Sequence, residues 1–414
     1  MVLVIDCFKL VKGAGKSIGI YNLTRSLIEA LGRENLRRGC PETILVLGNE
    51  QNRRDMSPEG VRFEKVEGDP LDRRTVLLWE LFRAGRKARS CHADRILFPR
   101  GFRPLWYRGR DTIIIHDLIP FYYHRQYPGY FGRLENGYIM NRLRASIRGA
   151  DRVITISDYS REEIERLVPG TSGKITRIYN GLNDIAPWKD AGAQEKVRAG
   201  AGDRGGAERE CAESAARTNA PEGAGRESAP YIAAVTSPLP HKNASGILRA
   251  YQAYYALAAD KGETPLSLCV IGIEDAGEYR AQAGLTDEAA AHIRCIRYLA
   301  DFADMCRVIA GAELFLFLSY AEGFGFPPLE AMQLGTPVIC SDRTSLPEVV
   351  GDAGILVDPD RTEQVAEAIW RLAGDPALKE ALAAKGAANT ARFSWESRTR
   401  EYWQELFDEG SGRA

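Results

Sequence analysis

The stretch Glu322-Gly-Phe-Gly-Phe-Pro-Pro-Leu-Glu330 places two carboxylates on either side of a glycine turn that leads into a helix. The preceding run, Glu313-Leu-Phe-Leu-Phe-Leu-Ser319, is apolar enough to form a strand buried on both faces. Pro327 and Pro328 are tolerated where a helix begins. We therefore expect a strand, a turn and a helix in succession, with Glu330 in the first helical turn.

This unit has the properties of a site for a polyhydroxylated ligand that carries phosphate. Gly323 and Gly325 permit backbone conformations that other residues resist, and they let a ligand approach the main chain. Free N–H groups at the start of the helix attract phosphate, and carboxylates accept hydroxyl protons from sugars. Taken alone, Glu322 could be a solvated loop residue and Glu330 a complement to the helix dipole. The rest of the chain argues against that simpler interpretation.

Short apolar runs alternate with helical patterns, which is typical of parallel sheets flanked by helices. The expected strands are residues 2–5, 43–47, 112–115 and 153–156 in the first half, and 231–235, 266–271, 293–296, 314–318, 337–340 and 354–357 in the second. A chain of 414 residues exceeds one typical core, so the sequence predicts two domains.

The segment between the two halves differs in composition. Residues 190–228 are rich in Ala, Gly, Glu and Arg, with almost no large apolar side chain from Gly200 onward. Such a stretch cannot bury enough surface to offset the entropy lost on ordering. We expect domains at residues 1–185 and 230–396, joined by a flexible insertion at 186–229. A regulatory or partner-binding segment is the alternative for the insertion.

Composition narrows the class of protein. A formal net charge of −1, without a block of like charge, argues against nucleic acid as a partner. The eight cysteines are scattered without a C-x-x-C pair, which indicates reduced thiols in a cytosolic protein. Residues 1–6 are typical of a strand rather than a signal peptide, and no window reaches the length of a membrane-spanning helix. We expect a cytoplasmic protein, with any membrane contact peripheral and at the inner face.

With residues 331–339 and 345–350 added, the stretch from Glu322 closely resembles the donor-binding region of glycosyltransferase family 4. The family's other landmarks are matched in order by His116-Asp117-Leu118, residues 152–160, Ile178-Tyr-Asn-Gly181 and His241-Lys242-Asn243. The resemblance implies the α/β fold called GT-B, with two facing Rossmann-like domains, parallel sheets and an interdomain cleft. It also implies a closing helix at 397–414 that packs back on the first domain.

The resemblance assigns roles in a donor site on the second domain. Glu322 would accept hydroxyls of the donor sugar, and Glu330 would bind the ribose of the nucleotide. The backbone of Gly323, Phe324, Gly325 and Phe326 would lie near the sugar and the diphosphate.

Lys242 resembles the family's phosphate-binding lysine, a compact cation that neutralises the departing diphosphate. A lysine in a polar loop is usually only solvated, so its place after the strand at 231–235 supports the assignment. Ser237 and His241 belong to the same donor loop. Here the chain departs from the family pattern, because His241 replaces a common Arg. One cationic contact is then either lost or made only when His241 is protonated.

Two residues of the first domain follow an expected strand. His116 ends the strand at 111–115, and ligands bind at the carboxyl ends of parallel strands. We assign it a positioning and polarising role at the reacting sugar; the alternative is a histidine satisfied by loop backbone. Asp117 could bind acceptor hydroxyls or cap the turn into residues 118–120, and capping is the favoured use.

Two further segments are candidates for acceptor or diphosphate contacts. Gly15 and Ser17 lie in a glycine loop after the first strand, but the loop lacks a dinucleotide fingerprint, so NAD is not expected. The aromatic and basic stretch 120–133 could stack on sugars, rest on a membrane near a lipid-linked acceptor, or simply pack a helix. Arg100 and Arg103 are candidates for the same cleft.

The sequence thus predicts retaining transfer of a hexosyl unit from a nucleotide sugar, GDP-mannose or a UDP-sugar, to a glycan or lipid-linked glycan acceptor in surface polysaccharide biosynthesis. No cofactor or metal is expected, because Asp358-Pro-Asp360 follows a strand as a turn would. Two alternatives stay open. One is an epimerase or phosphorylase on the same fold, and the other is a non-catalytic protein that binds nucleotide sugars.

Overall fold

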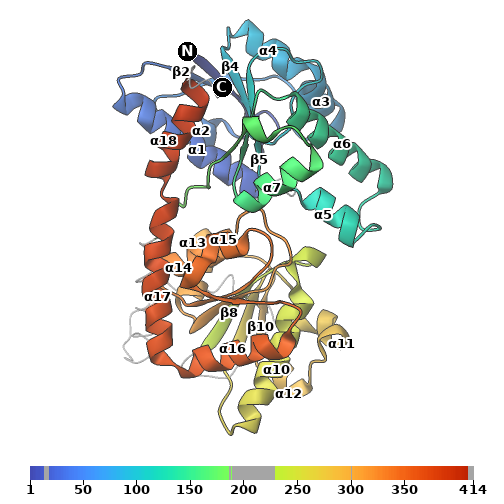
Figure 1. The fold of residues 1–414 in the computed structure, drawn as a ribbon, viewed down its shortest axis with the longest axis vertical. Coiled ribbons are helices and arrows are strands. Elements are labelled where there is room, and N and C mark those ends of the chain that lie inside the picture. The colour runs from blue at the N-terminus through green and yellow to red at the C-terminus, as the bar shows by residue number, and fades with distance from the viewer. Residues whose placement is uncertain (14–17, 186–187, 189–228, 300, 409–414) are drawn as a thin grey trace, which may run out of the picture.

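The computed structural model describes residues 1–13, 18–185, 188, 229–299 and 301–408. They form two α/β domains, one above the other in Figure 1, each built on a parallel sheet. Almost all of the predicted insertion at 186–229 lies outside the described residues, as do Gly15 and Ser17.

The first domain has a seven-stranded sheet in the order β3-β2-β1-β4-β5-β6-β7, in which every pair is parallel. β1 pairs with a strand on each side: its Leu3 lies opposite Ile44 of β2 and opposite Arg95 of β4. The strands are β1 (Val2–Asp6), β2 (Thr43–Gly48), β3 (Arg62–Lys65), β4 (Arg95–Phe98), β5 (Asp111–Ile115), β6 (Arg152–Thr155) and β7 (Ile175–Arg177).

Helices cover both faces of this sheet, as right-handed crossovers between parallel strands require. They are α1 (Ile18–Arg37), α2 (Arg53–Met56), α3 (Arg73–Leu78), α4 (Ala84–Ser90), α5 (Ile119–Gln126), α6 (Arg133–Gly149) and α7 (Asp158–Leu167). A π-helical turn, Trp79–Arg83, joins α3 to α4.

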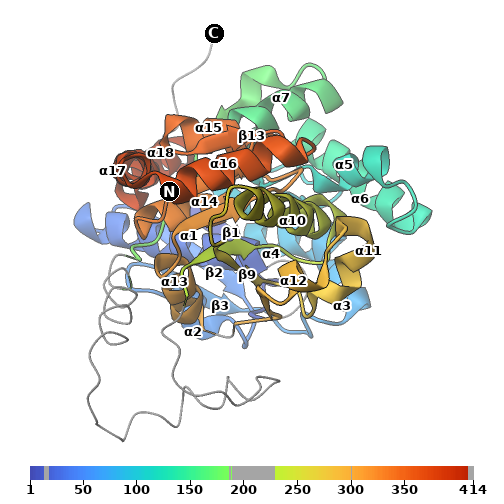
Figure 2. The ribbon, with the colours of Figure 1, turned by 90° about the horizontal axis from the view of Figure 1, so that it is seen from below.

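The second domain has a six-stranded parallel sheet in the order β10-β9-β8-β11-β12-β13. Its strands are β8 (Tyr231–Val235), β9 (Ser267–Ile271), β10 (Ile293–Ile296), β11 (Leu314–Phe317), β12 (Val338–Ser341) and β13 (Ile355–Val357). Its helices are α10 (Ala244–Asp260), α11 (Arg280–Ala283), α12 (Asp287–Ala290), α13 (Phe302–Ala310), α14 (Phe326–Gln333), α15 (Leu346–Val350) and α16 (Thr362–Gly374). Figure 2 shows α10 and α16 side by side.

All ten strands expected from the sequence are present, within one residue at each end. β3, β4 and β7 were not expected. One detail of the prediction is wrong: α14 begins at Phe326, one residue before the prolines, so Glu330 lies in the second helical turn. Among the described residues, no helix combines the length and the apolar character that crossing a bilayer requires.

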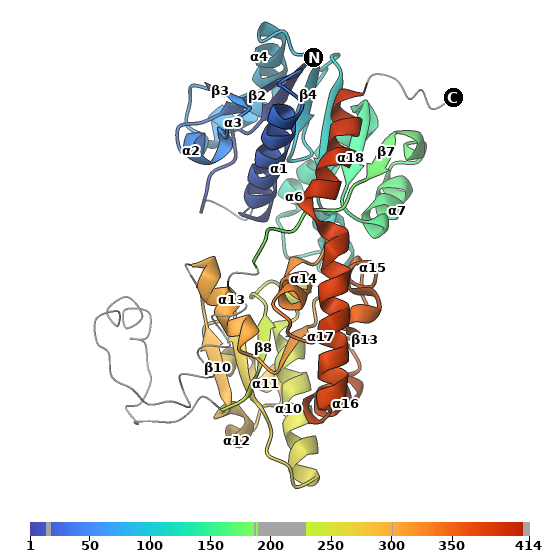
Figure 3. The same ribbon diagram turned by 90° about the vertical axis from the view of Figure 1, so that its left-hand side faces the viewer.

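Two long helices connect the domains along one side, as Figure 3 shows: α17 (Pro376–Thr390) and α18 (Trp395–Phe407). The closing helix begins at Trp395 and packs on α1 of the first domain. Where the chain crosses between domains, the Leu182 N–H donates to the Phe393 carbonyl oxygen at 2.7 Å.

Aromatic rings fill the junction between the domains. Phe324, Tyr179 and Phe393 lie with ring centroids 5.3–6.1 Å apart, and all three are buried. Burying a ring of this size contributes roughly 1.5–3 kcal/mol. The glycine-rich turn at 322–326 is therefore anchored by its own Phe324 at the domain boundary.

Candidate active site

The strand order locates a site before any side chain is considered. In both sheets the order reverses beside the first strand, between β1 and β4 and between β8 and β11. In open α/β sheets, ligands bind outside the carboxyl ends of the strands at such a reversal. Ser237 and Lys242 follow β8, Ser319 and Glu322 follow β11, and His116 follows β5. The topology therefore puts the predicted site residues at strand ends.

Lys242 and Glu322 form an ion pair, with Nζ 2.7 Å from Oε1. The two side chains are 25% and 11% exposed, so the lysine is held against the carboxylate rather than extended into solvent. Asn243 fixes the lysine loop: its backbone is left-handed (φ 55°), its Oδ1 caps α10, and its Nδ2 donates to the Leu318 carbonyl at 3.0 Å. Lys242 and Glu322 thus form a pair of opposite charges, and Asn243 holds the loop that carries the lysine.

Two side chains that were not predicted as site residues hold the Glu322 turn. The Glu322 N–H donates to Thr344 Oγ1 at 3.0 Å. The Ser345 hydroxyl lies 3.0 Å from the Glu322 carbonyl oxygen and 2.8 Å from that of Phe324. Ser345 fell within a stretch that carried the family resemblance, whereas Thr344 gave no signal beyond its position next to it.

Both glycines of the turn are needed, for different reasons. Gly325 has φ of 120°, and a Cβ there would lie 2.7 Å from Leu346 Cδ2. A Cβ on Gly323 would lie 2.1 Å from the His116 carbonyl oxygen and 3.0 Å from Asp117 Cβ. Gly323 therefore lets the second domain meet the first directly beside His116.

The turn offers backbone donors to a ligand. Within the described chain, the N–H groups of Gly323, Phe324 and Gly325 have no acceptor. The start of the helix supplies fewer donors than expected, because Pro327 and Pro328 stand in its first turn and have no N–H. A phosphate at this place would meet mainly the amides of the turn, which include the N-cap residue Gly325. Since the Phe324 ring is buried, that residue can contribute only its backbone.

Glu330 is a half-buried carboxylic acid on α14, and its carboxylate has no hydrogen-bond partner in the part of the chain that the structure describes. Burial raises its pKa to about 7. A ligand hydroxyl that donated to this group would stabilise its ionised form. The side chain thus has the free acceptor capacity that ribose binding requires.

His116 is buried directly after β5. Its Nε2 lies 2.8 Å from the Pro99 carbonyl oxygen and so carries the proton, while the buried Nδ1 has no partner among the described residues. Burial lowers its pKa to about 4, which keeps the ring neutral at neutral pH. Loop backbone thus satisfies one nitrogen, as the alternative interpretation expected, and the role at the reacting sugar stays a prediction.

Asp117 caps a turn, which was the favoured prediction: its Oδ1 accepts the Ile119 N–H at 3.0 Å. Burial raises its pKa, the negative charge of Glu322 raises it further, and Lys242 opposes the shift. The side chain therefore belongs to the same electrostatic cluster as the ion pair.

His241 makes a different contact from the one expected. Its Nδ1 lies 2.7 Å from the hydroxyl of Tyr123, on α5 of the first domain. Burial, together with the charge of Lys242, lowers its pKa to about 4. The ring therefore supplies no cation at neutral pH and joins the domains instead. Tyr123 is itself buried and packs on Tyr130 and Phe131, so it is not available for sugar stacking or membrane contact.

Sequence reasoning missed another interdomain contact. The Glu348 carboxylate, on α15, accepts the Asp158 N–H at 2.7 and 2.9 Å and the Tyr159 N–H at 3.3 Å. It thus caps the first turn of α7 in the other domain, where a negative charge is favoured. Beside it, the Ser157 hydroxyl donates to the Gly323 carbonyl at 3.1 Å. Both segments carried the resemblance, but nothing in the sequence paired them.

Buried polar atoms without partners mark the strand ends. Ser237 Oγ follows β8, Ser319 Oγ follows the neighbouring β11, and neither has a hydrogen-bond partner among the described residues. His116 Nδ1 is a third such atom. Native interiors satisfy nearly all buried polar groups, so a polar ligand at these strand ends would find three atoms with free hydrogen-bonding capacity.

Two other candidates are structural. Arg103 donates to Asp111 Oδ2 at 2.7 Å, and Arg100 pairs with Glu80, so neither guanidinium is free. Asp358 and Asp360 both pair with Arg343, at 2.6 and 3.2 Å, and the Asp360 N–H donates to Asp358 Oδ1 as in a turn. Across the described ranges, no group of three or more His, Cys, Asp or Glu side chains is arranged to hold a metal ion.

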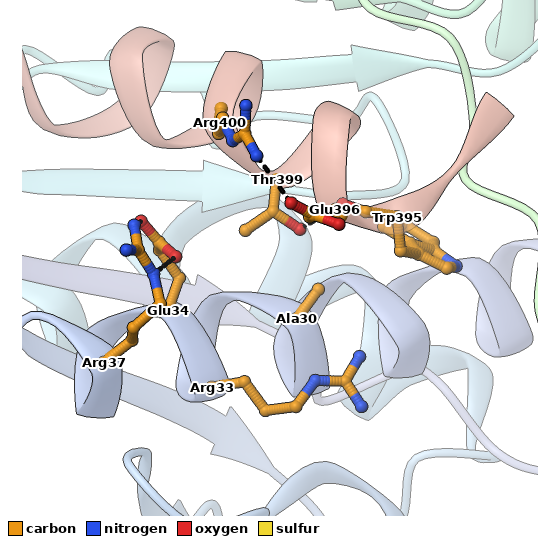
Figure 4. A pocket seen from close by; sticks show the side chains of 8 residues that line it. All are labelled: Ala30, Arg33, Glu34, Arg37, Trp395, Glu396, Thr399 and Arg400. Atoms are coloured by element: carbon orange, nitrogen blue, oxygen red, sulfur yellow. Dashed lines mark hydrogen bonds and ion pairs between the residues drawn. The ribbon is translucent and has the colours of Figure 1, made fainter. Parts of the chain in front are cut away.

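A pocket of about 410 Å³ lies elsewhere, between α1 and α18 (Figure 4). Its charged residues are largely paired with one another, Arg37 with Glu34 and Arg400 with Glu396. It contains none of the predicted site residues, so we do not assign it to the donor.

Comparisons with known proteins point to one family. The chain matches the model of Glycosyltransferase Family 4 over residues 22–184 and that of Glycosyl transferases group 1 over residues 230–375. The O-antigen chain mannosyltransferase B of Escherichia coli is 32% identical over 294 residues, which cover 70% of this chain and 68% of that protein. A serotype-specific mannosyltransferase of E. coli, WbdA, is 26% identical over 295 residues, and the chain spans 32% of its length.

Two solved structures share the fold over nearly their whole length. One is WaaG, a glycosyltransferase involved in lipopolysaccharide biosynthesis, with a TM-score of 0.64 and 15% identity over 99% of this chain and 100% of that one. The other is Anabaena HepE in complex with UDP and glucose, with a TM-score of 0.62 and 18% identity over 98% and 99%. These likenesses confirm the GT-B fold. By its fold and its relatives, the chain is a glycosyltransferase and belongs to glycosyltransferase family 4.

Proposed function

We propose that the chain transfers a mannosyl unit from GDP-mannose to a hydroxyl of a growing surface polysaccharide, with retention of anomeric configuration and without a metal. The names of two relatives support mannose as the sugar, and that of the first supports an O-antigen type of glycan as the product. A UDP-sugar is the alternative donor. The acceptor is a glycan, free or lipid-linked.

The observation that carries this proposal is the Lys242–Glu322 pair at the strand reversal of the second sheet, opposite His116. In the free protein the two charges neutralise each other. With donor bound, Glu322 would accept a sugar hydroxyl and Lys242 would face the diphosphate, so each charge would keep a partner.

The proposed reaction breaks the bond between the anomeric carbon and the diphosphate oxygen and forms the bond to the acceptor oxygen on the same face. The proton of the acceptor hydroxyl passes to the departing diphosphate. Lys242 and the amides of Gly323 to Gly325 stabilise the charge that develops there. Neutral His116 accepts a sugar hydroxyl through Nδ1 and fixes the ring, which contributes by orientation rather than by proton transfer.

The donor is tested by thermal unfolding in EDTA with GDP, UDP, dTDP, ADP and their common sugar conjugates, with Glu330→Ala alongside. A ligand that binds only the native state adds RT ln(1 + [L]/Kd), about 2.7 kcal/mol at a concentration of 100 Kd. We expect GDP and GDP-mannose to stabilise the wild type and not the variant. Selective stabilisation by another nucleotide would identify the donor as a sugar conjugate of that nucleotide. If no nucleotide stabilised the protein, the non-catalytic alternative would be favoured.

The reaction is tested by following donor and acceptor together by NMR. We expect an α-linked product from an α-linked donor, at the same rate with EDTA as with Mn²⁺, and a loss on Glu322→Gln that the exposed Glu396→Gln does not show. An inverted product would refute retention, and a strict need for Mn²⁺ would refute metal independence. Donor conversion without acceptor would indicate an epimerase, and a need for free phosphate would indicate a phosphorylase.

A further inference from the structure

Five of the eleven large hydrophobic side chains that are exposed in the described part of the chain belong to one stretch of the first domain, residues 71–106. They are Leu71 (56% exposed), Leu77 (42%), Leu78 (43%), Phe82 (38%) and Trp106 (79%). We call this set the Trp106 face. Single exposed apolar residues are ordinary, whereas clustered ones mark interaction sites. Leu78, Phe82 and Trp106 are clustered here, through a spacing of four along the helical segment and a contact between the two rings.

Three of the five belong to a continuous helical segment made of α3, the π-helical turn and α4. Figure 1 labels α3 and α4 on the first domain. Val76, Trp79, Ala84 and Ala88 are buried against the sheet. The π-helical turn adds a residue to one turn, and so keeps Ala84 and Ala88 on the same inner side as Val76. The outer side is then free to present Leu78 and Phe82 in line, four residues apart.

Trp106 joins the helix from a separate loop. Its ring stacks on Phe82 with centroids 6.1 Å apart, and the adjacent Leu105 N–H donates to the Leu81 carbonyl at 3.0 Å. The Trp106 backbone is left-handed, with φ of 55°, which is unfavourable for a bulky residue. Within the protein, this strained conformation gives the ring one aromatic neighbour and leaves most of it in solvent.

Positive charge surrounds the apolar row. The exposed arginines of the segment are Arg73, Arg74, Arg83, Arg86 and Arg89, and none forms an ion pair with a described residue. Two acidic side chains lie in the same stretch: Asp72 caps α3 through the Thr75 N–H and stays exposed, and Glu80 turns inward to Arg100. Five exposed arginines against one exposed carboxylate leave the segment with a net positive charge at its surface.

We propose that the Trp106 face docks the first domain on an anionic membrane surface. Leucine, phenylalanine and tryptophan side chains would enter the boundary between headgroups and acyl chains, while the arginines contact lipid phosphates. A row along a helix, flanked by cations, fits a flat bilayer better than the hollow of a protein partner. This docking is independent of the proposed reaction, and it moves the membrane contact away from the aromatic stretch at 120–133.

The test is sedimentation of the full chain with phosphatidylcholine vesicles and with vesicles that also contain phosphatidylglycerol. We expect binding to the anionic vesicles, weakened by high salt. Phe82→Ser combined with Trp106→Ser should lower the partition coefficient at least about tenfold, because two large apolar side chains no longer insert. Leu134→Ser is the matched control, since Leu134 is 91% exposed on α6 outside the face, and it should bind as the wild type does.

A second measurement does not depend on the double variant folding. Brominated phosphatidylglycerol quenches tryptophan that enters the bilayer, and the chain has six tryptophans. The quenched fraction should fall in Trp106→Phe, which keeps an aromatic side chain at that position. Failure of the wild type to bind anionic vesicles, equal quenching in Trp106→Phe, or an equal loss in Leu134→Ser would overturn the proposal. The proposal would also be overturned if the wild type formed a dimer in solution and the double variant were a monomer, because the face would then bind a second copy of the chain.

Discussion

The hydroxyl of Tyr123, on α5 of the first domain, lies 2.7 Å from Nδ1 of His241, on the loop after β8 of the second. His241 directly precedes Lys242, whose Nζ pairs with Glu322. A hydrogen bond between two buried, uncharged groups therefore ties the first domain to the loop that holds the site lysine. The histidine that replaces a common arginine in this family has gained a structural partner.

Replacing Tyr123 with phenylalanine should remove this tie. The buried His241 nitrogen would lose its partner, and an unsatisfied buried polar group costs about 1–3 kcal/mol. We expect the free energy of unfolding to fall by about that amount, and kcat/KM for transfer to fall roughly tenfold as the Lys242 loop loosens. Urea unfolding and donor turnover measure the two effects. Tyr138→Phe, at a position 46% exposed on α6, is the control and should change neither.

The two buried histidines should shape the stability in mild acid. The pKa values of His116 and His241 are about 4 in the folded chain, below the usual 6.5, so the unfolded chain binds more protons between those values. Each histidine's contribution is present above pH 6.5 and is lost as the pH falls toward 4. In His241→Asn, the decrease in unfolding free energy from pH 6.5 to pH 4 should be smaller by up to about 3 kcal/mol. Parallel urea series across that range would show it, and identical slopes would contradict it.

The sequence predicted strands well where burial leaves an uninterrupted apolar run, as at Leu314–Phe317. It failed at β3 and β7, the two edge strands of the first sheet, where charged residues interrupt the apolar side chains. Edge strands bury too little to leave an apolar pattern. It also failed at β4, a central strand whose four buried residues include Arg95 and so give only a short apolar run.

In the site, too, some residues could be predicted from the sequence and others could not. Glu322 and Glu330 stand in one motif, and the resemblance of that motif to the family was enough to predict them. Pairs between the domains could not be predicted in this way, because Tyr123 and His241 are 118 positions apart, and Asp158 and Glu348 are 190 apart. Such pairs depend on how two domains meet, which local pattern does not encode.

Glu330 should release a proton when nucleotide binds. Its pKa of about 7 means that about half of the molecules carry the proton at neutral pH, and ribose hydroxyls that donate to the carboxylate would favour the ionised form. Calorimetry at pH 7 in buffers of different ionisation enthalpy should therefore give different apparent binding enthalpies. The difference should disappear in Glu330→Gln. Equal enthalpies for the wild type in all buffers would place the ribose elsewhere.

The same substitution should raise stability at alkaline pH. A carboxyl with a raised pKa contributes stability below pH 4.5 that is lost as the pH rises through 7, so the ionised Glu330 is unfavourable at pH 8. At pH 8 we expect the free energy of unfolding of Glu330→Gln to exceed that of the wild type by on the order of 1–3 kcal/mol. Because the side chain is partly exposed, solvent screens its charge and places the gain in the lower part of this range. Urea unfolding at pH 8 and pH 5 measures this, and the gain should be absent at pH 5.

Glu348→Gln should weaken the contact between the domains. The carboxylate accepts two N–H groups at the start of α7, and its charge is favoured by the helix dipole. Losing the charge should cost about 1 kcal/mol, in the range of other helix caps. Glu396→Gln is the control, because that carboxylate is 81% exposed and forms its ion pair within one helix, with Arg400 four residues on. A loss no larger than the control's would mean that α7 does not depend on Glu348.

Gly323→Ala should separate the domains without unfolding either. The added Cβ would lie 2.1 Å from the His116 carbonyl oxygen, which belongs to the backbone of the other domain and cannot rotate away. We expect the rate of transfer to fall at least about tenfold, because His116 and the Lys242–Glu322 pair would no longer meet around one ligand. Small-angle scattering should show a larger radius of gyration, while circular dichroism stays unchanged.

Gly137→Ala is the control. A Cβ there meets nothing within 4 Å, and alanine in the helix should stabilise the protein by roughly 0.5–1 kcal/mol. Full activity in Gly323→Ala would show that catalysis does not require the contact between Gly323 and His116.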